Sequence, residues 1–178
     1  MQKRPLYRYL RAICRAIDGI NLWLGQGVAW LTVLVVLVVF ANVVMRYLLN
    51  SSFVFMQELE WHLFAMIFLL GGGYTLCKDG HVRVDIFYQR FSPRGRAWLN
   101  LIGVLFFLLP GCYLVITTAL PFVNSSLQML EGSPDPGGLP YRFILKSMIP
   151  LAFLLIALQG VAMGIRSVLT IAGGEVDG

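Results

Sequence analysis

Residues 31–40 read LTVLVVLVVF, and Thr32 is the one residue among them that is not apolar. This stretch lies in a window of 27 residues, Gly19 to Met45, that contains no charge. About 20 apolar residues, at about 1.5 Å each, cross the roughly 30 Å of bilayer hydrocarbon. A lipid-facing β-strand would alternate, and the core of a signal peptide is much shorter. The window therefore predicts an uncleaved transmembrane helix.

Three further windows without charge follow: Trp61 to Cys77 with 17 residues, Ala97 to Leu130 with 34, and Ser147 to Ile165 with 19. Each is mainly apolar, as a membrane helix requires. The sequence thus predicts an all-α integral membrane protein with one four-span domain over residues 1–178. The expected spans are approximately 22–45, 59–77, 98–122 and 147–166.

The overall composition excludes several classes of protein. Of the 178 residues, 58% are apolar and 13% are charged, whereas a soluble domain carries roughly 25% charged residues. The three cysteines are too few and too scattered for a disulfide framework or a thiolate metal site. Since the net charge of +5 is spread over the ends of the spans, it gives no support to a nucleic-acid partner.

The basic residues predict the orientation of the spans. Eleven of the fourteen lysines and arginines lie in the N-terminal arm, the connection between spans two and three, and the C-terminal tail. The other three are Arg46, Arg142 and Lys146. Because basic residues are enriched on the cytoplasmic side, both termini are expected to be cytoplasmic, with residues 1–18 as a basic cytoplasmic arm.

Residues able to carry chemistry are few. His62 and His81 are the only histidines, and a continuous helix would separate them by about 28 Å, so they cannot ligate one haem. We expect His62 to be a hydrogen-bonded packing residue. No Asp, Glu, Lys or Arg lies inside the four windows, and Glu58 and Glu60 fall at the outer boundary, close to solvent. The sequence predicts no enzyme activity and no cofactor.

Neutral polar and small residues enter two of the spans at helical spacing. In the second span Glu58, His62 and Gly72 or Gly73 share one face, while Phe64 and Phe68 point elsewhere. In the fourth, Gln159 precedes a G-x-x-x-G pair. Such faces suit either packing within the bundle or docking to a larger membrane partner. We expect prolines to bend the third span and to interrupt the fourth; they are Pro110, Pro121 and Pro150.

Two segments at the ends of spans are richer in polar residues. The first is NVVMRYLLNSSFVFMQEL at 42–59, in which we expect Arg46 to pair with Glu58 or Glu60. The second is DGHVRVD at 79–85. Here Arg83 and Asp85 form either a solvated pair or a specific contact.

These two segments resemble the small membrane (DctQ-like) subunit of tripartite ATP-independent periplasmic (TRAP) transporters. The matching residues in the first segment are Asn42, Arg46, Tyr47, Asn50, Ser51, Glu58 and Leu59. In the second they are His81, Val82, Arg83, Val84 and Asp85. Phe55 and Gln57 stand where the family usually has Trp and Glu. Length, layout and orientation also agree, so the resemblance covers nearly the whole chain.

The resemblance implies a secondary transporter of three parts in the bacterial inner membrane. A periplasmic binding protein delivers an organic anion, such as a carboxylate, to a large permease subunit that holds the substrate and sodium sites. The small subunit is a scaffold in the lipid. The rival interpretations are a membrane anchor subunit of a redox enzyme and a stand-alone four-helix transporter.

Three groups of residues receive roles under this interpretation. We expect Arg46, Asn50, Ser51 and Glu58 to organise the outer end, and Asn42 and Tyr47 belong to the same partner-binding or structural motif. His81, Arg83 and Asp85 would fix the inner loop against the bundle or the large subunit. Glu131, Arg142, Lys146 and the loop GSPDPGGLP (132–140) are candidates for contacting the binding protein.

Overall fold

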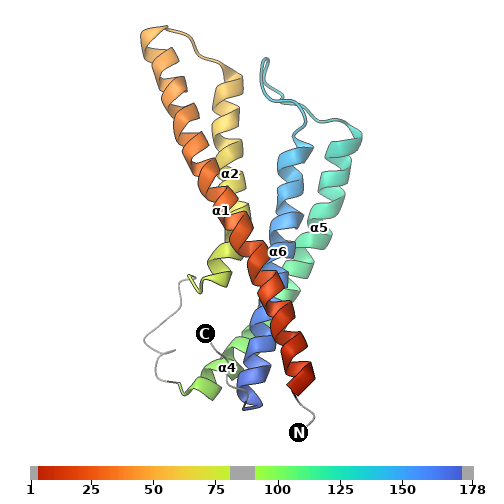
Figure 1. Cartoon of the computed structure of the whole chain (residues 1–178). Helices are drawn as coiled ribbons and strands as arrows, with labels where there is room; N and C mark the ends of the chain where they lie inside the picture. The colour runs from red at the N-terminus through yellow and green to blue at the C-terminus, as the bar shows by residue number, and fades with distance from the viewer. Residues whose placement is uncertain (1–3, 81–90, 174–178) are drawn as a thin grey trace.

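A computed structural model describes residues 4–80 and 91–173, and those residues form helices and connecting loops without any strand. Four helical stretches are long and apolar enough to cross a membrane, which confirms the predicted all-α, four-span fold. In chain order the elements are α1 (Arg4–Leu48), α2 (Val54–Cys77), α4 (Pro93–Gly103), the π-helical η1 (Val104–Leu108), α5 (Leu109–Gln128) and α6 (Phe143–Ile171) (Figure 1).

The first helix extends well beyond the span expected at 22–45. It begins at Arg4 and runs unbroken for 45 residues, or about 68 Å at 1.5 Å per residue. The described part of the basic arm is therefore helical and continuous with the first span. A helix of this length exceeds the roughly 30 Å of hydrocarbon, so its basic part continues past the apolar window.

Helix α6 is the centre of the bundle. It contacts α1, α2, α4, η1 and α5, and 33% of its most apolar window is buried, compared with 6% for α1. The buried face consists mainly of small or polar residues, which allow close approach of neighbouring helices. These residues are Ala152, Leu155, Gln159, Gly160, Ala162, Gly164, Ser167 and Leu169.

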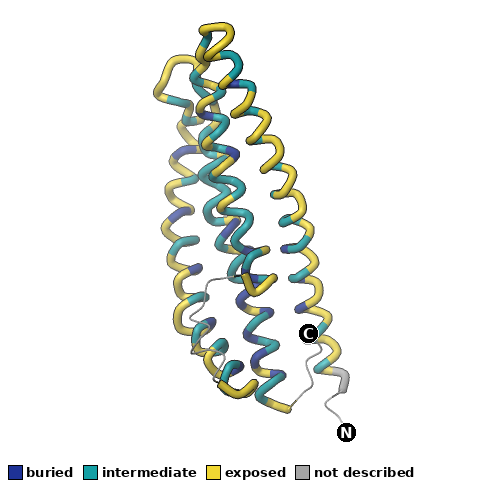
Figure 2. The backbone as a smooth tube through the Cα atoms, turned by 90° about the vertical axis from the view of Figure 1, so that its left-hand side faces the viewer, coloured by how far each residue is buried: buried dark blue, intermediate teal, exposed yellow. Residues whose placement is uncertain are grey.

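The connections define two ends of the molecule. At one end, here the loop end, residues 49–53 join α1 to α2 and residues 129–142 join α5 to α6. At the opposite end, here the terminal end, α1 begins and α6 ends (Figure 1). The α1–α2 and α5–α6 pairs splay apart towards the loop end in this view. Figure 2 shows that exposed residues follow the outer sides of the helices along most of their length.

Glycines allow the helices to touch within the bundle. A Cβ atom at Gly73 of α2 would lie 2.2 Å from Oδ1 of Asn21 in α1, and one at Gly160 of α6 would lie 2.4 Å from Cδ2 of Leu108. The polar and small faces of the second and fourth spans therefore pack inside the bundle at these points. Phe64 and Phe68 are exposed, as expected.

The prolines act differently in the third and fourth spans. In the third, the Leu109 amide donates to the carbonyl of Val104, five residues earlier, just before Pro110. This wider turn accommodates a proline that has no N–H for the ordinary helical bond. The expected interruption at Pro150 is wrong, because α6 remains helical through it.

Candidate functional site

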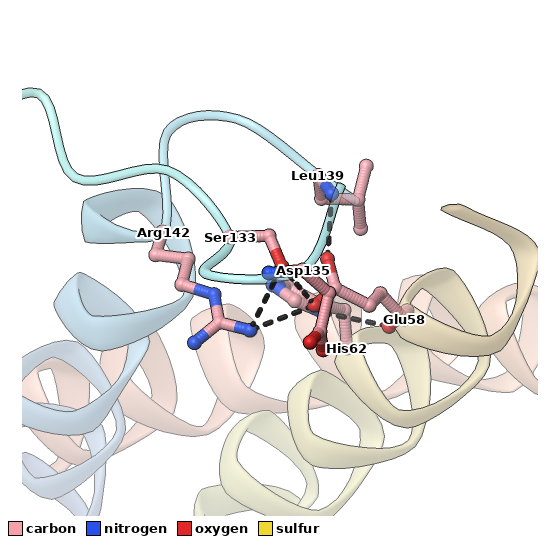
Figure 3. Close-up of polar contacts among 6 residues, drawn as sticks. All are labelled: Glu58, His62, Ser133, Asp135, Leu139 and Arg142. Atoms are coloured by element: carbon pink, nitrogen blue, oxygen red, sulfur yellow. Dashed lines mark hydrogen bonds and ion pairs between the residues drawn. The ribbon is translucent and has the colours of Figure 1, made fainter. Parts of the chain in front are cut away.

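The loop end is held by a group of polar contacts centred on Glu58, which we call the loop-end clamp (Glu58, Ser133, Leu139 and Arg142). Oε1 of Glu58 accepts hydrogen bonds from Oγ of Ser133 at 2.6 Å and from Nη2 of Arg142 at 2.7 Å. Oε2 accepts from the backbone amide of Leu139 at 2.5 Å. One carboxylate on α2 therefore binds both limbs of the α5–α6 loop and the start of α6 (Figure 3).

The composition of the loop explains how it reaches Glu58. A Cβ at Gly138 would lie 2.7 Å from Oε2 of Glu58 and 2.4 Å from Oγ of Ser133, so only glycine permits this approach. The loop also closes on itself, since the Ser133 amide donates to the carbonyl of Leu139 at 3.0 Å. The Ser133 hydroxyl accepts from the Asp135 amide at 3.1 Å. The predicted irregular loop at 132–140 is thus an ordered, folded segment.

Burial makes the contacts of Glu58 stronger than those of a surface carboxylate. Glu58 is 4% exposed, and the side chain of its ion-pair partner Arg142 is 22% exposed. A charge removed from water in this way needs its partners, since an unpaired buried charge is costly. The expected position of Glu58 close to solvent is corrected by the loop that covers it.

Two aromatic neighbours complete the clamp. Nδ1 of His62 lies 2.7 Å from the carbonyl oxygen of Glu58, so this nitrogen carries the proton and donates. The rings of His62 and Trp61 lie with their centroids 3.8 Å apart, and the guanidinium of Arg142 lies 5.6 Å from the centroid of the Trp61 ring. The hydrogen bond expected for His62 as an interface residue is present.

A second ion pair, between Glu131 and Lys146, closes the base of the same loop. The hydrogen bond from Lys146 holds the pKa of the Glu131 carboxyl below its usual range, with Ser126 adding to the effect. The ammonium of Lys146 also lies 4.0 Å from the centroid of the Phe122 ring. Glu131, Arg142 and Lys146, which the sequence named only as weaker candidates, are therefore the residues that join the loop to α6.

The expected pairing of Arg46 with Glu58 or Glu60 is wrong. Glu58 pairs with Arg142, and Oε1 of Glu60 accepts a hydrogen bond from Nδ2 of Asn42 at 2.6 Å. Arg46 and Tyr47 are exposed on the last turn of α1. The cause is distance along the chain: the Pro/Gly-rich loop brings Arg142, the residue just before α6, to Glu58, and spacing within the first two spans does not reveal that contact.

Asn50 and Ser51 terminate the first helix. Asn50 has a φ of +49°, a left-handed conformation that asparagine adopts more readily than most residues. This turn lets the Ser51 amide donate back to the carbonyl of Met45 at 3.1 Å, and the Ser51 hydroxyl donates to the carbonyl of Leu49 at 3.2 Å. Both residues thus help to terminate α1.

The remaining predicted residues, His81, Arg83 and Asp85, lie outside the described residues. Their expected role in the inner loop stays a prediction. Within the described ranges, no three His, Cys, Asp or Glu side chains converge as a metal site would require.

The structure also reveals a polar group that sequence reasoning missed, here called the terminal-end network (Asp18, Asn21, Cys77, Gln159 and Arg166). Gln159 is its centre: Nε2 donates to Oδ1 of Asp18 at 2.9 Å, and Oε1 accepts from Nδ2 of Asn21 at 2.9 Å. Arg166 forms an ion pair with Asp18, and Sγ of Cys77 donates to Oδ1 of Asp18 at 3.6 Å.

A signal for this network was present in the sequence. Asp18 and Arg166 are the charges that bound the first and fourth uncharged windows. Their opposite signs, at the ends of two spans expected on the same side of the membrane, could have indicated a pair. The network ties α1, α2 and α6 together where they converge.

The fold and these two polar groups define a class: a multi-pass helical membrane protein whose charged side chains serve to hold its own helices and loop together. Residues 35–170 match the family model of tripartite ATP-independent periplasmic transporters, DctQ component. The chain belongs to this family, and it is a small subunit of a TRAP transporter. This family is a family of transporter components and not of enzymes, in agreement with the prediction of no enzyme activity.

A relative supports the assignment. The chain is 31% identical over 108 residues to a Haemophilus influenzae protein that carries the name TRAP transporter small permease protein. The match covers 59% of this chain and 65% of the relative, so the chain spans a little less than two thirds of that protein's length. No solved structure matches.

Proposed function

We propose that this chain is the scaffold subunit of a three-part importer in the bacterial inner membrane. Its partners are a large permease subunit, which carries the transport site, and a periplasmic protein that delivers the substrate. In this arrangement the termini are cytoplasmic and the loop end faces the periplasm. The charge distribution supports this orientation, because eleven of the fourteen basic residues lie in the N-terminal arm, the connection between spans two and three, and the C-terminal tail of the sequence.

The scaffold proposal rests on the hydrogen bonds of the carboxylates at the ends of the spans. Asp18, Glu58 and Glu60 each accept hydrogen bonds from side chains of this chain. A carboxylate that binds and releases an ion or substrate needs free ligand positions within the bundle. These three are engaged in joining helices, which suits a subunit that supports transport carried out elsewhere.

The loop-end clamp supports a docking role for residues 129–142. Long ordered loops on a rigid scaffold often carry binding functions, and here the clamp fixes the loop from both limbs. The tip, residues 134–137, is exposed and includes Asp135. We place the contact with the periplasmic binding protein on this tip.

The cargo of the complex is an organic anion, most simply a carboxylate, and a sodium gradient drives its import. Both assignments come from the properties of TRAP transporters as a family. The sodium and substrate sites lie in the large subunit, and this subunit needs no cofactor of its own.

Reconstitution tests the proposal. Proteoliposomes containing the small subunit, its large subunit and the binding protein should accumulate a labelled carboxylate only when a sodium gradient is imposed. Liposomes with the small subunit alone should show no uptake. Flux through the small subunit alone would refute the scaffold role, and a haem Soret band in the purified chain would favour the redox-anchor alternative.

The predicted inner-loop residues can be tested in the same preparation. Arg83→Ala should reduce the amount of large subunit that co-purifies with the small subunit. Normal assembly together with full uptake by this variant would contradict the role given to Arg83.

A further inference from the structure

The most unusual surface within the spans is a stripe on α1 made of Trp23, Gln26, Gly27 and Trp30. Their spacing of i, i+3, i+4 and i+7 places them on one face of the helix. Both indoles are strongly exposed, Trp23 at 72% and Trp30 at 76%, and Gln26 and Gly27 are exposed between them. A Cβ at Gly27 would meet nothing within 4 Å. Gly27 thus leaves a notch in the helix surface, and the indole rings of Trp23 and Trp30 lie on either side of it along the helix.

The notch continues as a groove of about 460 Å³ that reaches Leu70 of α2. The depth of this groove in the membrane follows from the contacts between α1 and α2. Asn42 contacts Glu60, and Asp18 contacts Cys77, so the uncharged part of α2 lies beside residues 18–42 of α1. Gln26 is eight residues from Asp18, or about 12 Å along the helix. The groove is therefore within the apolar layer.

Gln26 makes this surface unsuitable for lipid alone. Its carboxamide has two donors and an acceptor, and in the described residues no hydrogen bond engages it. Lipid tails cannot satisfy such a group, and unsatisfied polar groups are costly in hydrocarbon. Side-chain amides in membrane helices are instead found at contacts between helices.

The shape of the notch indicates what kind of helix fits it. In a symmetric contact between two copies of this chain, the same patch would face itself, so the indoles of each copy would have to fill the notch of the other beside a second Gln26 amide. A different helix can place a protruding side chain at Gly27 between the two indoles and a polar group against Gln26. We therefore look for that helix in another subunit, and contact between two copies is an outcome of the test below.

We propose that the stripe of Trp23, Gln26, Gly27 and Trp30 is the docking site for a transmembrane helix of the large permease subunit. This inference rests on the proposed function, which supplies the partner. The docking helix carries a side chain that fills the notch and a polar side chain that pairs with the Gln26 amide. The site lies on the outer side of α1, away from the loop-end clamp, so that the two partners of the scaffold occupy separate surfaces.

Filling the notch tests the site without disturbing the fold of this chain. Gly27→Leu introduces a side chain into open space and replaces glycine with a better helix former. The matched control is Gly111→Leu on α5, another exposed glycine of a span with nothing within 4 Å of its Cβ position. The readout is the amount of large subunit retained by the tagged small subunit in mild detergent. We expect retention about tenfold weaker for Gly27→Leu, as overpacking predicts, and unchanged for Gly111→Leu.

A photo-crosslinking residue in place of Trp30 identifies the occupant directly, with the same residue in place of exposed Tyr113 as the control. An adduct with the large subunit from position 30 supports the site. Adducts with a second copy, adducts with lipid alone, or full retention by Gly27→Leu would overturn it while leaving the proposed function intact. If the wild-type chain retains no large subunit, the proposed function and the docking site both fail.

Discussion

The terminal-end network offers a quantitative test of what holds the bundle together, through the substitution Gln159→Leu. Gln159 is 1% exposed, and leucine has a similar volume, so the change removes hydrogen bonds while largely preserving packing. It deletes the bond to the Asp18 carboxylate and the bond from the Asn21 amide, each 2.9 Å long.

The size of the effect follows from the two bonds. A hydrogen bond to a charged group contributes about 1.5–3 kcal/mol and a neutral one about 0.5–1.5 kcal/mol. Bonds between helices inside membranes are weaker on average, at about 0.6 kcal/mol, and the Asp18 side chain is 21% exposed, which allows water to replace part of the loss. We therefore expect Gln159→Leu to lower the free energy of unfolding by about 2 kcal/mol.

The assay is unfolding of the purified chain by sodium dodecyl sulfate in mixed micelles, followed by helical circular dichroism. Gln128→Leu is the matched control, because Gln128 is exposed at the end of α5 and its change should stay within about 0.5 kcal/mol. A double-mutant cycle with Asp18→Ala should give a coupling of at least about 0.5 kcal/mol. Equal stabilities for Gln159→Leu and Gln128→Leu, with no coupling to Asp18, would refute the network.

Three other outcomes are expected. Gly73→Ala should destabilise the chain by about 1–3 kcal/mol through overpacking, because the new Cβ would lie 2.2 Å from Asn21 Oδ1, whereas Gly71→Ala should cost nothing, since no atom lies within 4 Å there; equal effects would contradict the close approach of α1 and α2. Glu58→Ala should speed hydrogen exchange of the 129–142 amides and weaken the binding protein's affinity, while Glu60→Ala should leave loop exchange unchanged; a loop that stays protected in Glu58→Ala would count against the clamp. Because Lys146 lowers the pKa of Glu131, the pair stabilises the loop above the ordinary glutamate pKa of about 4.3 and loses this effect as the pH falls below it; the protection of the loop amides, measured as their exchange rate relative to the intrinsic rate at the same pH, should therefore fall at acid pH in the wild-type chain, and a Glu131→Gln variant that shows the same fall would refute the role of this pair.

The clamp shows why the site was only partly predictable. Asn42, Asn50, Ser51 and Glu58 were all selected from the sequence. Asn42, Ser51 and Glu58 form hydrogen bonds at the loop end, and Asn50 adopts the left-handed turn that follows α1. Their partners were not predicted correctly, because Ser133, Leu139 and Arg142 lie 75, 81 and 84 residues from Glu58 along the chain. Spacing within one helix indicates which side chains share a face, and it gives no information on which distant segment covers that face.

The number of spans and the class of the protein follow from the sequence alone, because charged side chains avoid hydrocarbon and four windows of the chain contain none. The family follows from the residues at the ends of the first two spans. The packed structure was needed to show that α6 is the central helix, that Arg142 and not Arg46 pairs with Glu58, and that Gln159 joins α1 to α6. The physical reason is that the pattern of apolar residues indicates whether each helix lies in lipid or in water, one helix at a time. Hydrogen bonds between helices depend instead on which helix faces meet.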